Sequence, residues 1–156
     1  MPVLNVPSAV GPLTLVEQDG ALVRLGWGDT PDDLPGGSPT PLLAEAARQL
    51  AAYFDRKLTD FDLPLGPPGS DYQKRIWQTM KKIPYGETWT YGELASRADT
   101  VPRAVGGACG ANPIPVILPC HRVVAANGGA GGYSGKGGLR TKSVLLDIEN
   151  RTARLL

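Results

Sequence analysis

Cysteine and histidine are scarce in this chain of 156 residues, which holds two cysteines and one histidine. Two cysteines do not make a disulfide framework, so we expect the protein to work in a reducing compartment. No apolar run approaches the roughly 20 residues needed to cross a bilayer, which argues against a membrane protein. The first residues carry neither a basic segment nor a long apolar core, and we therefore expect no secretory signal.

The composition is that of a globular protein, with 42% hydrophobic and 20% charged residues. Its length suits one domain or two small ones. The net charge of +1 conceals an asymmetry: four Lys/Arg against nine Asp/Glu give −5 in residues 1–69, and twelve against six give +6 in residues 70–156. The second half would attract a polyanion such as DNA, although domains often differ in charge without any binding role.

The first half, residues 1–69, has the pattern of a scaffold domain with a small sheet and one helix. Apolar alternation predicts a hairpin of Leu13–Glu17 and Ala21–Trp27 across a tight turn. Apolar residues recur at helical spacing over Pro41–Phe54, directly after a threonine suited to cap a helix. A further strand is expected within Leu58–Leu65, before a Gly-Pro-Pro-Gly linker.

The second half, residues 70–156, is mainly helical by the same criteria. Asp71–Ile83 has the spacing of an amphipathic helix. Two short helices follow, Thr90–Ala98 and Pro102–Gly110, and the brief break between them predicts a helix-turn-helix. The sequence therefore predicts an α+β protein, with a small N-terminal sheet-plus-helix domain followed by a mainly helical C-terminal domain.

The second helix of this pair is nearly bare of side chains. Its small residues are Ala104, Gly106, Gly107, Ala108 and Gly110. Since each glycine costs a helix about 1 kcal/mol relative to alanine, the bare surface needs a reason. It permits close approach of another backbone, which is either a neighbouring helix or an external partner.

The most informative stretch is Asn112–Val124, which contains Cys120 and the single histidine, His121. Apolar residues on both sides of Cys120 predict a buried strand interrupted by a short turn. A thiol acts as a nucleophile only as the thiolate, and a neighbouring imidazole is a common way to form it. Taken alone, the Cys-His pair favours a small buried residue without any reactivity.

The surrounding motifs carry a specific resemblance. The segments Arg103-Ala104-Val105-Gly106, Asn112-Pro113 and Pro119-Cys120-His121-Arg122-Val123 closely resemble the O6-alkylguanine-DNA alkyltransferase family, also called methylated-DNA–protein-cysteine methyltransferases. The resemblance runs from about Tyr72 to Glu149 and more faintly through the first half. It implies a DNA repair protein that flips O6-alkylguanine out of duplex DNA and transfers the alkyl group irreversibly to its own Cys120. One molecule would repair one lesion, and O4-alkylthymine remains open as a further substrate.

The resemblance also implies a catalytic set. Cys120 would be the alkyl acceptor, and His121 would take its proton through a bound water. Glu149 would hold His121 in one tautomer, although a solvated glutamate at a helix end fits the pattern equally well. Asn112 would brace the helix-turn-helix against the active-site segment.

For DNA, the family likeness assigns roles in the helix-turn-helix. Tyr91 would assist rotation of the nucleotide and donate a hydrogen bond to the guanine ring; a buried core tyrosine is the alternative. Arg103 would enter the duplex and fill the vacated space, where an ordinary phosphate contact is the alternative. Ala104, Gly106 and Gly107 would lie in the minor groove, where larger side chains would hold the helix away.

The remaining implied residues line the alkyl pocket. The Val123 carbonyl would accept from the exocyclic amine of guanine, Tyr133 would pack on the base, and the Ser134 backbone N–H would donate to O6. No cofactor or metal is implied, and since residues 1–69 lack Cys and His, the structural zinc of some family members cannot form here. The expected partner is double-stranded DNA carrying O6-alkylguanine, and the expected state is a cytoplasmic monomer, nucleoid-associated in a prokaryote or nuclear in a eukaryote.

Three other functions deserve comparison. A non-catalytic lesion sensor related to these transferases would replace the acceptor cysteine, which is present here as Cys120. A transcriptional regulator would need a recognition helix rich in side chains for major-groove readout. A Cys-His hydrolase would need an oxyanion hole, for which the sequence offers no sign.

Overall fold

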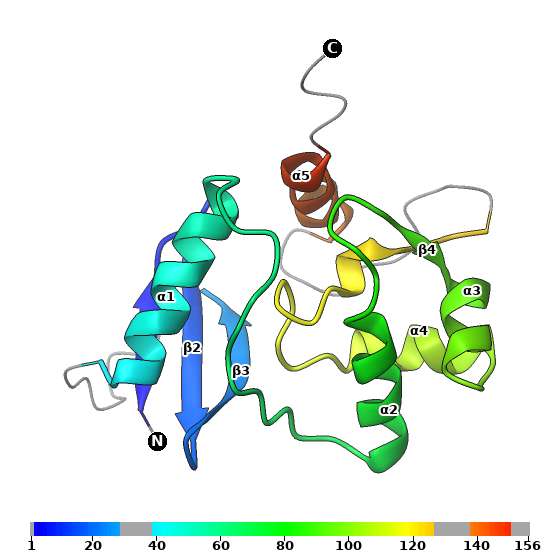
Figure 1. Ribbon diagram of the computed structural model, residues 1–156, viewed down its shortest axis with the longest axis horizontal. Coiled ribbons are helices and arrows are strands. Elements are labelled where there is room, and N and C mark those ends of the chain that lie inside the picture. The colour runs from blue at the N-terminus through cyan, green and yellow to red at the C-terminus, as the bar shows by residue number, and fades with distance from the viewer. Residues whose placement is uncertain (1, 29–38, 127–137, 151–156) are drawn as a thin grey trace. The chain divides into compact units, whose positions relative to one another are not determined.

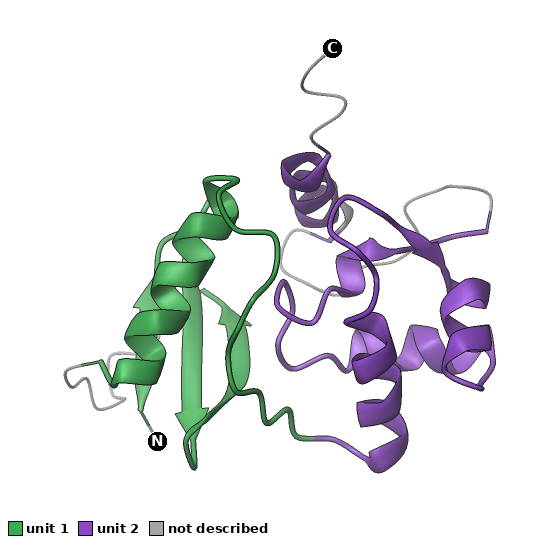
Figure 2. Ribbon diagram, in the orientation of Figure 1, with its two compact units in different colours: residues 1–68 green, residues 69–156 purple. Residues whose placement is uncertain are grey.

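The computed structural model describes residues 2–28, 39–126 and 138–150, and the chain divides into two compact units, residues 1–68 and 69–156 (Figures 1 and 2). The first holds a three-stranded sheet and one helix, and the second holds the remaining helices and a two-stranded sheet. The α+β class predicted from the sequence is confirmed. Within the described residues no helix combines the length and the apolar character that a membrane crossing requires.

The sheet of the first unit is antiparallel, in the order β1 (Val3–Val6), β2 (Leu13–Gln18), β3 (Ala21–Trp27). The predicted hairpin is confirmed as β2 and β3, whose register places Leu15 opposite Leu25. Asp19 and Gly20 both have positive φ at the turn, as the tightest hairpin connections require. The alternation along β2 buries Leu13 and Leu15 completely, so one face of the sheet forms the core.

Helix α1 (Pro41–Phe54) lies across that sheet and contacts all three strands (Figure 1). The predicted N-cap is present, because Thr40 Oγ1 accepts a hydrogen bond from the Leu43 N–H at 3.1 Å. The helical face toward the sheet is fully buried at its apolar positions, which are Leu43, Ala46, Leu50 and Tyr53.

The strand expected within Leu58–Leu65 is wrong. Only an isolated bridge between Leu65 and Leu22 forms there. The buried Gln49 side chain explains the difference, because its amide donates to the Asp62 carbonyl at 3.0 Å and accepts from the Asp62 N–H at 2.9 Å. Pro64, which has no N–H, further limits ladder pairing.

The second unit begins with α2 (Asp71–Met80), which ends three residues earlier than predicted. The helix-turn-helix is confirmed as α3 (Tyr91–Arg97) and α4 (Pro102–Gly110), and α5 (Leu139–Glu149) completes the unit. Complete capping boxes start α2 and α3, with Ser70 and Thr90 as the capping residues. In these helices, local sequence sets the starting points.

Trp77 ties α2 to α4. Its indole Nε1 donates to the Ala108 carbonyl of α4 at 2.9 Å, and the ring is 1% exposed. Val105 and Ala108 are the buried residues of α4. One side of α4 is thereby fixed to the unit.

Candidate active site

The segment that carries Cys120 is buried from Ile114 to Val123, but it is not the interrupted strand expected from the sequence. Val116 has φ of +74°, which no strand residue adopts, and Pro115 and Leu118 form only an isolated bridge. The prolines account for the difference, since each removes a donor and fixes its own backbone. Cys120 therefore lies at the start of a short 3-10 helix, η1 (Cys120–Arg122).

A two-stranded parallel sheet joins this segment to the helix-turn-helix. Strand β4 (Trp89–Thr90) pairs with β5 (Val123–Val124), with Trp89 opposite Val123. Thr90 also caps α3, so Tyr91, the first residue of that helix, follows directly from the sheet. Tyr91 is half-buried. The sheet thereby sets the position of α3 relative to the residues that follow Cys120.

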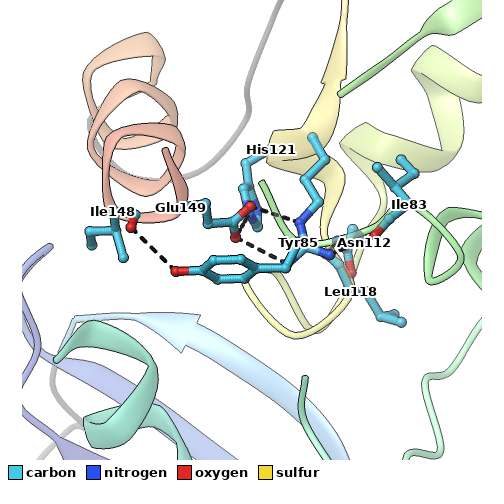
Figure 3. Close-up of polar contacts among 8 residues, drawn as sticks. Ile83, Tyr85, Asn112, Leu118, His121, Ile148 and Glu149 are labelled. Carbon is cyan, nitrogen blue, oxygen red and sulfur yellow. Dashed lines mark hydrogen bonds and ion pairs between the residues drawn. The ribbon is translucent and has the colours of Figure 1, made fainter. Parts of the chain in front are cut away.

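Asn112 links the end of α4 to the same segment. Its Nδ2 donates to the Leu118 carbonyl at 2.8 Å (Figure 3). Its Oδ1 accepts from the Ile114 N–H at 2.9 Å. Both bonds close the loop that precedes Cys120, whose own N–H donates to the Leu118 carbonyl at 2.8 Å. The bracing role that the resemblance implied for Asn112 stays a prediction.

His121 and Glu149 meet in the interior although 28 residues separate them. His121 Nε2 lies 2.6 Å from Glu149 Oε2, with side chains 0% and 2% exposed (Figure 3). Burial alone would raise the pKa of the Glu149 carboxyl, but the hydrogen bonds and charges of His121 and Arg122 outweigh it and lower that pKa to about 2. The alternative of a solvated glutamate is therefore wrong.

The same contact determines the state of the imidazole. Burial lowers the pKa of His121 below its usual 6.5, against the opposing effect of Glu149, so the ring is neutral near pH 7. A neutral ring beside a carboxylate donates from Nε2, which leaves a lone pair on Nδ1. Nδ1 is buried and has no hydrogen-bond partner among the described residues. It is thus the ring atom available to accept a proton.

Arg122 approaches the same carboxylate from the other side. Its Nε donates to Glu149 Oε1 at 2.8 Å and its Nη2 to Glu149 Oε2 at 3.1 Å. Its Nη1 donates to the Ile83 carbonyl at 2.8 Å. The guanidinium is almost fully buried, so it supports the core by pairing.

Lys142 is a buried cation that the sequence reading missed. The side chain is 0% exposed, and Nζ donates to the Val123 carbonyl at 2.6 Å. Burial lowers the pKa of Lys142, and the thiols of Cys109 and Cys120 oppose that shift. A signal was present, because Lys142 shares helical spacing with Leu145 and Ile148, which are both buried.

The two cysteines differ in their surroundings. Cys120 is 6% exposed and adjoins His121, whereas Cys109 is half-buried on α4. Burial, with a smaller contribution from the charge of Cys120, raises the pKa of Cys109 to about 12, and Lys142 opposes this only partly. A thiol with that pKa is almost entirely protonated near neutrality and is a poor nucleophile.

The residues expected to meet DNA lie along α4. Arg103, Gly106 and Gly107 are exposed, and Ala104 is half-buried. A Cβ built on Gly106, Gly107 or Gly110 meets nothing within 4 Å. Among the described residues, no neighbouring helix lies close enough to these glycines to explain them by packing. Tyr133 and Ser134 lie outside the described residues.

Comparison with known proteins decides the family. Residues 71–151 match the DNA binding domain, and residues 5–67 the ribonuclease-like domain, of 6-O-methylguanine DNA methyltransferase. The chain belongs to the 6-O-methylguanine DNA methyltransferase family. Methylated-DNA–protein-cysteine methyltransferases from Mycolicibacterium paratuberculosis and Methanosarcina acetivorans are each 41% identical to this family member; the matches cover 94% and 91% of the chain and 91% and 94% of those proteins.

Solved structures agree with this assignment. The crystal structure of Mycobacterium tuberculosis OGT in complex with DNA superposes with a TM-score of 0.84 at 40% identity, over 97% of this chain and 94% of that one. An O6-methylguanine DNA methyltransferase from Methanococcus jannaschii gives a TM-score of 0.68 at 29% identity, over 94% and 93%. In the parts of the chain that the structure describes, no group of three or more Cys, His, Asp and Glu side chains is placed to hold a metal ion.

Proposed function

We propose that this family member repairs O6-alkylguanine in duplex DNA by transferring the alkyl group to Sγ of Cys120, once per molecule. The observation that carries the proposal is the buried contact between His121 and Glu149, directly after the buried Cys120 in the chain. A nucleophile, a neutral base with a free nitrogen, and a carboxylate that orients that base are the parts such a reaction needs. Family membership supports the same chemistry.

The proposed step balances as a direct displacement. The Cys120 thiol gives its proton to His121 Nδ1, directly or through one water. The thiolate then attacks the alkyl carbon and forms an S–C bond, while the C–O6 bond breaks and its electron pair stays on the guanine. The departing base is protonated, with Tyr91 as the donor to its ring. The thioether product has no free thiol, so the protein acts once.

The O6 position is hidden in a stacked duplex, so the proposal includes extrusion of the nucleotide. Arg103, exposed in the first turn of α4, would fill the vacated space. The exposed glycines of α4 support close contact with the minor groove, because a Cβ at these positions would meet none of the described residues. The Val123 carbonyl and the predicted contacts of Tyr133 and Ser134 would receive the extruded base.

Intact-protein mass spectrometry tests the function. The protein is incubated with an excess of duplex DNA containing O6-methylguanine, in parallel with Cys120→Ser and with unmodified DNA. We expect a gain of about 14 Da, one methyl group per molecule, in the unsubstituted protein with methylated DNA only. Lesion binding without any mass gain would instead identify a sensor.

Two finer features complete the proposal. We infer that the protein binds DNA as a monomer, which sedimentation of the complex with a short duplex would test. We also infer a reducing compartment that contains DNA, since an oxidised acceptor thiol cannot take up an alkyl group.

A further inference from the structure

We propose that Arg122 is a positioning residue for alkyl transfer: its guanidinium holds the Glu149 carboxylate against His121 and keeps the ring neutral until the Cys120 proton arrives. The inference rests on the proposed function and extends it to a residue beside the catalytic set. Arg122 does not need to touch the substrate for this role. It acts through Glu149 and through its charge.

Arg122 contacts both oxygens of the Glu149 carboxylate. Glu149 Oε2 accepts from both His121, at 2.6 Å, and Arg122 Nη2, at 3.1 Å, while Oε1 accepts from Arg122 Nε at 2.8 Å. Two parallel bonds from a planar guanidinium fix the plane of a carboxylate, which a single donor cannot do. The orientation of Glu149, and with it that of His121, therefore depends on where Arg122 is held.

The turn after α2 holds Arg122 in place. Ile83 accepts from Arg122 Nη1 through its carbonyl, and the Tyr85 ring lies 5.7 Å below the guanidinium carbon. The Tyr85 hydroxyl in turn donates to the Ile148 carbonyl at 3.3 Å (Figure 3). A Cβ on Gly86 would lie only 3.3 Å from the Glu149 carbonyl oxygen. This turn therefore braces both Arg122 and the end of α5.

The positive charge of Arg122 acts on both Glu149 and His121. Arg122 and Glu149 form a buried pair of opposite charges, so the carboxylate stays ionised without help from a protonated His121. The positive charge of Arg122 also contributes to lowering the pKa of His121. An ionised Glu149 beside a neutral His121 is the arrangement that leaves Nδ1 able to accept a proton.

Other charged or titratable groups surround this site and stay constant in the test. They are Lys142 on α5, Cys120 on η1, Cys109 on α4, and Tyr85 and Glu87 in the turn before β4. Lys142 also lowers the pKa of His121. Because none of them is altered in the Arg122 variants, a change in the pH profile can be assigned to Arg122.

The experiment compares single-turnover methyl transfer from an O6-methylguanine duplex across pH for the unsubstituted protein, Arg122→Met and Arg122→Lys. Arg48→Met, which removes an exposed charge on α1, is the matched control. Circular dichroism establishes that each variant is folded. Transfer requires neutral His121, so each profile has an acidic limb where the ring becomes protonated.

We expect the plateau rate of Arg122→Met to fall about tenfold, which is part of the 10²–10⁴-fold rate contribution typical of general base catalysis. We also expect its acidic limb to move to higher pH. Arg122→Lys keeps the charge but not the paired bonds, so its plateau falls while its limb stays in place. A residue with only a structural role would leave the limb unmoved in both variants, and that result would overturn the inference.

Two further outcomes are decisive. If Arg122→Met does not fold, Arg122→Gln takes its place, because it also removes the charge: an acidic limb moved to higher pH supports the positioning role, and an unmoved limb contradicts it. If the unsubstituted protein transfers no methyl group, the proposed function itself fails. A failure of the inference alone is distinct, since the unsubstituted protein and Arg48→Met would both transfer at full rate.

Discussion

The two units of this protein bury very different kinds of side chain. In the described part of the first unit, the one buried polar side chain is Gln49, which donates to the Asp62 carbonyl and to Glu45 and accepts from the Asp62 N–H. In the described part of the second unit, six polar or charged side chains are buried: Thr79, His121, Arg122, Thr141, Lys142 and Glu149. Buried charges cost free energy unless they are paired. Their concentration around Cys120 therefore indicates a site selected for chemistry more than for stability.

The same difference is visible in two glutamates. Glu45 on α1 and Glu149 on α5 both have a pKa of about 2, and both pair with an arginine. For Glu45 the hydrogen bond from Arg48 is the largest cause, and the group is exposed. For Glu149 the pairing must first overcome burial. Equal pKa values thus conceal unequal contributions to stability.

The largest expected effect separates these two glutamates directly. Glu149→Gln should lower the free energy of unfolding by about 3–5 kcal/mol, because it leaves Arg122 buried without its charge partner. Glu45→Gln should produce no change beyond experimental error, because solvent screens the exposed pair. Urea titrations of both variants measure the difference, and equal losses would contradict the contrast between the units.

Acid should unfold the protein through the second unit. Burial lowers the pKa of His121 in the folded protein below its ordinary 6.5, so the unfolded chain takes up a proton more readily than the folded one. The free energy of unfolding therefore begins to fall as the pH drops below 6.5. The Glu149 carboxylate, with a pKa lowered from 4.5 to about 2, loses its contribution as the pH falls through that interval. That contribution is of order 3 kcal/mol. Urea midpoints between pH 7 and 2 test this, and Glu149→Gln should flatten the lower part of the curve.

Smaller effects of opposite sign are expected at glycines. Gly107→Ala should stabilise α4 by about 1 kcal/mol, since the added methyl group meets open space and favours the helix. The same change should weaken binding to duplex DNA if α4 lies in the minor groove. Gly20→Ala, also in open space but at φ of +78°, should instead destabilise the hairpin by about 1 kcal/mol. Unchanged DNA affinity in Gly107→Ala would remove the reason offered for the bare helix.

Local features of this fold were predictable because they depend on neighbouring residues. The caps at Thr40 and Thr90 and the hairpin turn at Asp19 and Gly20 follow from their immediate sequence. The segment before Cys120 was wrongly predicted as a strand from its apolar pattern alone. That prediction left out the prolines, each of which fixes its own backbone and removes a hydrogen-bond donor.

The site was less accessible to pattern reasoning. Contacts from His121 to Glu149 and from Arg122 to the Ile83 carbonyl join residues 28 and 39 positions apart, which periodicity does not relate. Glu149 was identified through the family resemblance. The partners of Arg122 follow only from the fold.

The most direct test of the account is where the methyl group is found. Both thiols fall between Arg103 and Arg122, so trypsin leaves Cys109 and Cys120 in one peptide, residues 104–122. Fragmentation of that peptide after reaction with O6-methylguanine DNA locates the added mass of about 14 Da. The account predicts that all of it lies on Cys120, because Cys109, with a pKa of about 12, remains protonated. Methyl groups on Cys109, alone or shared, would contradict it.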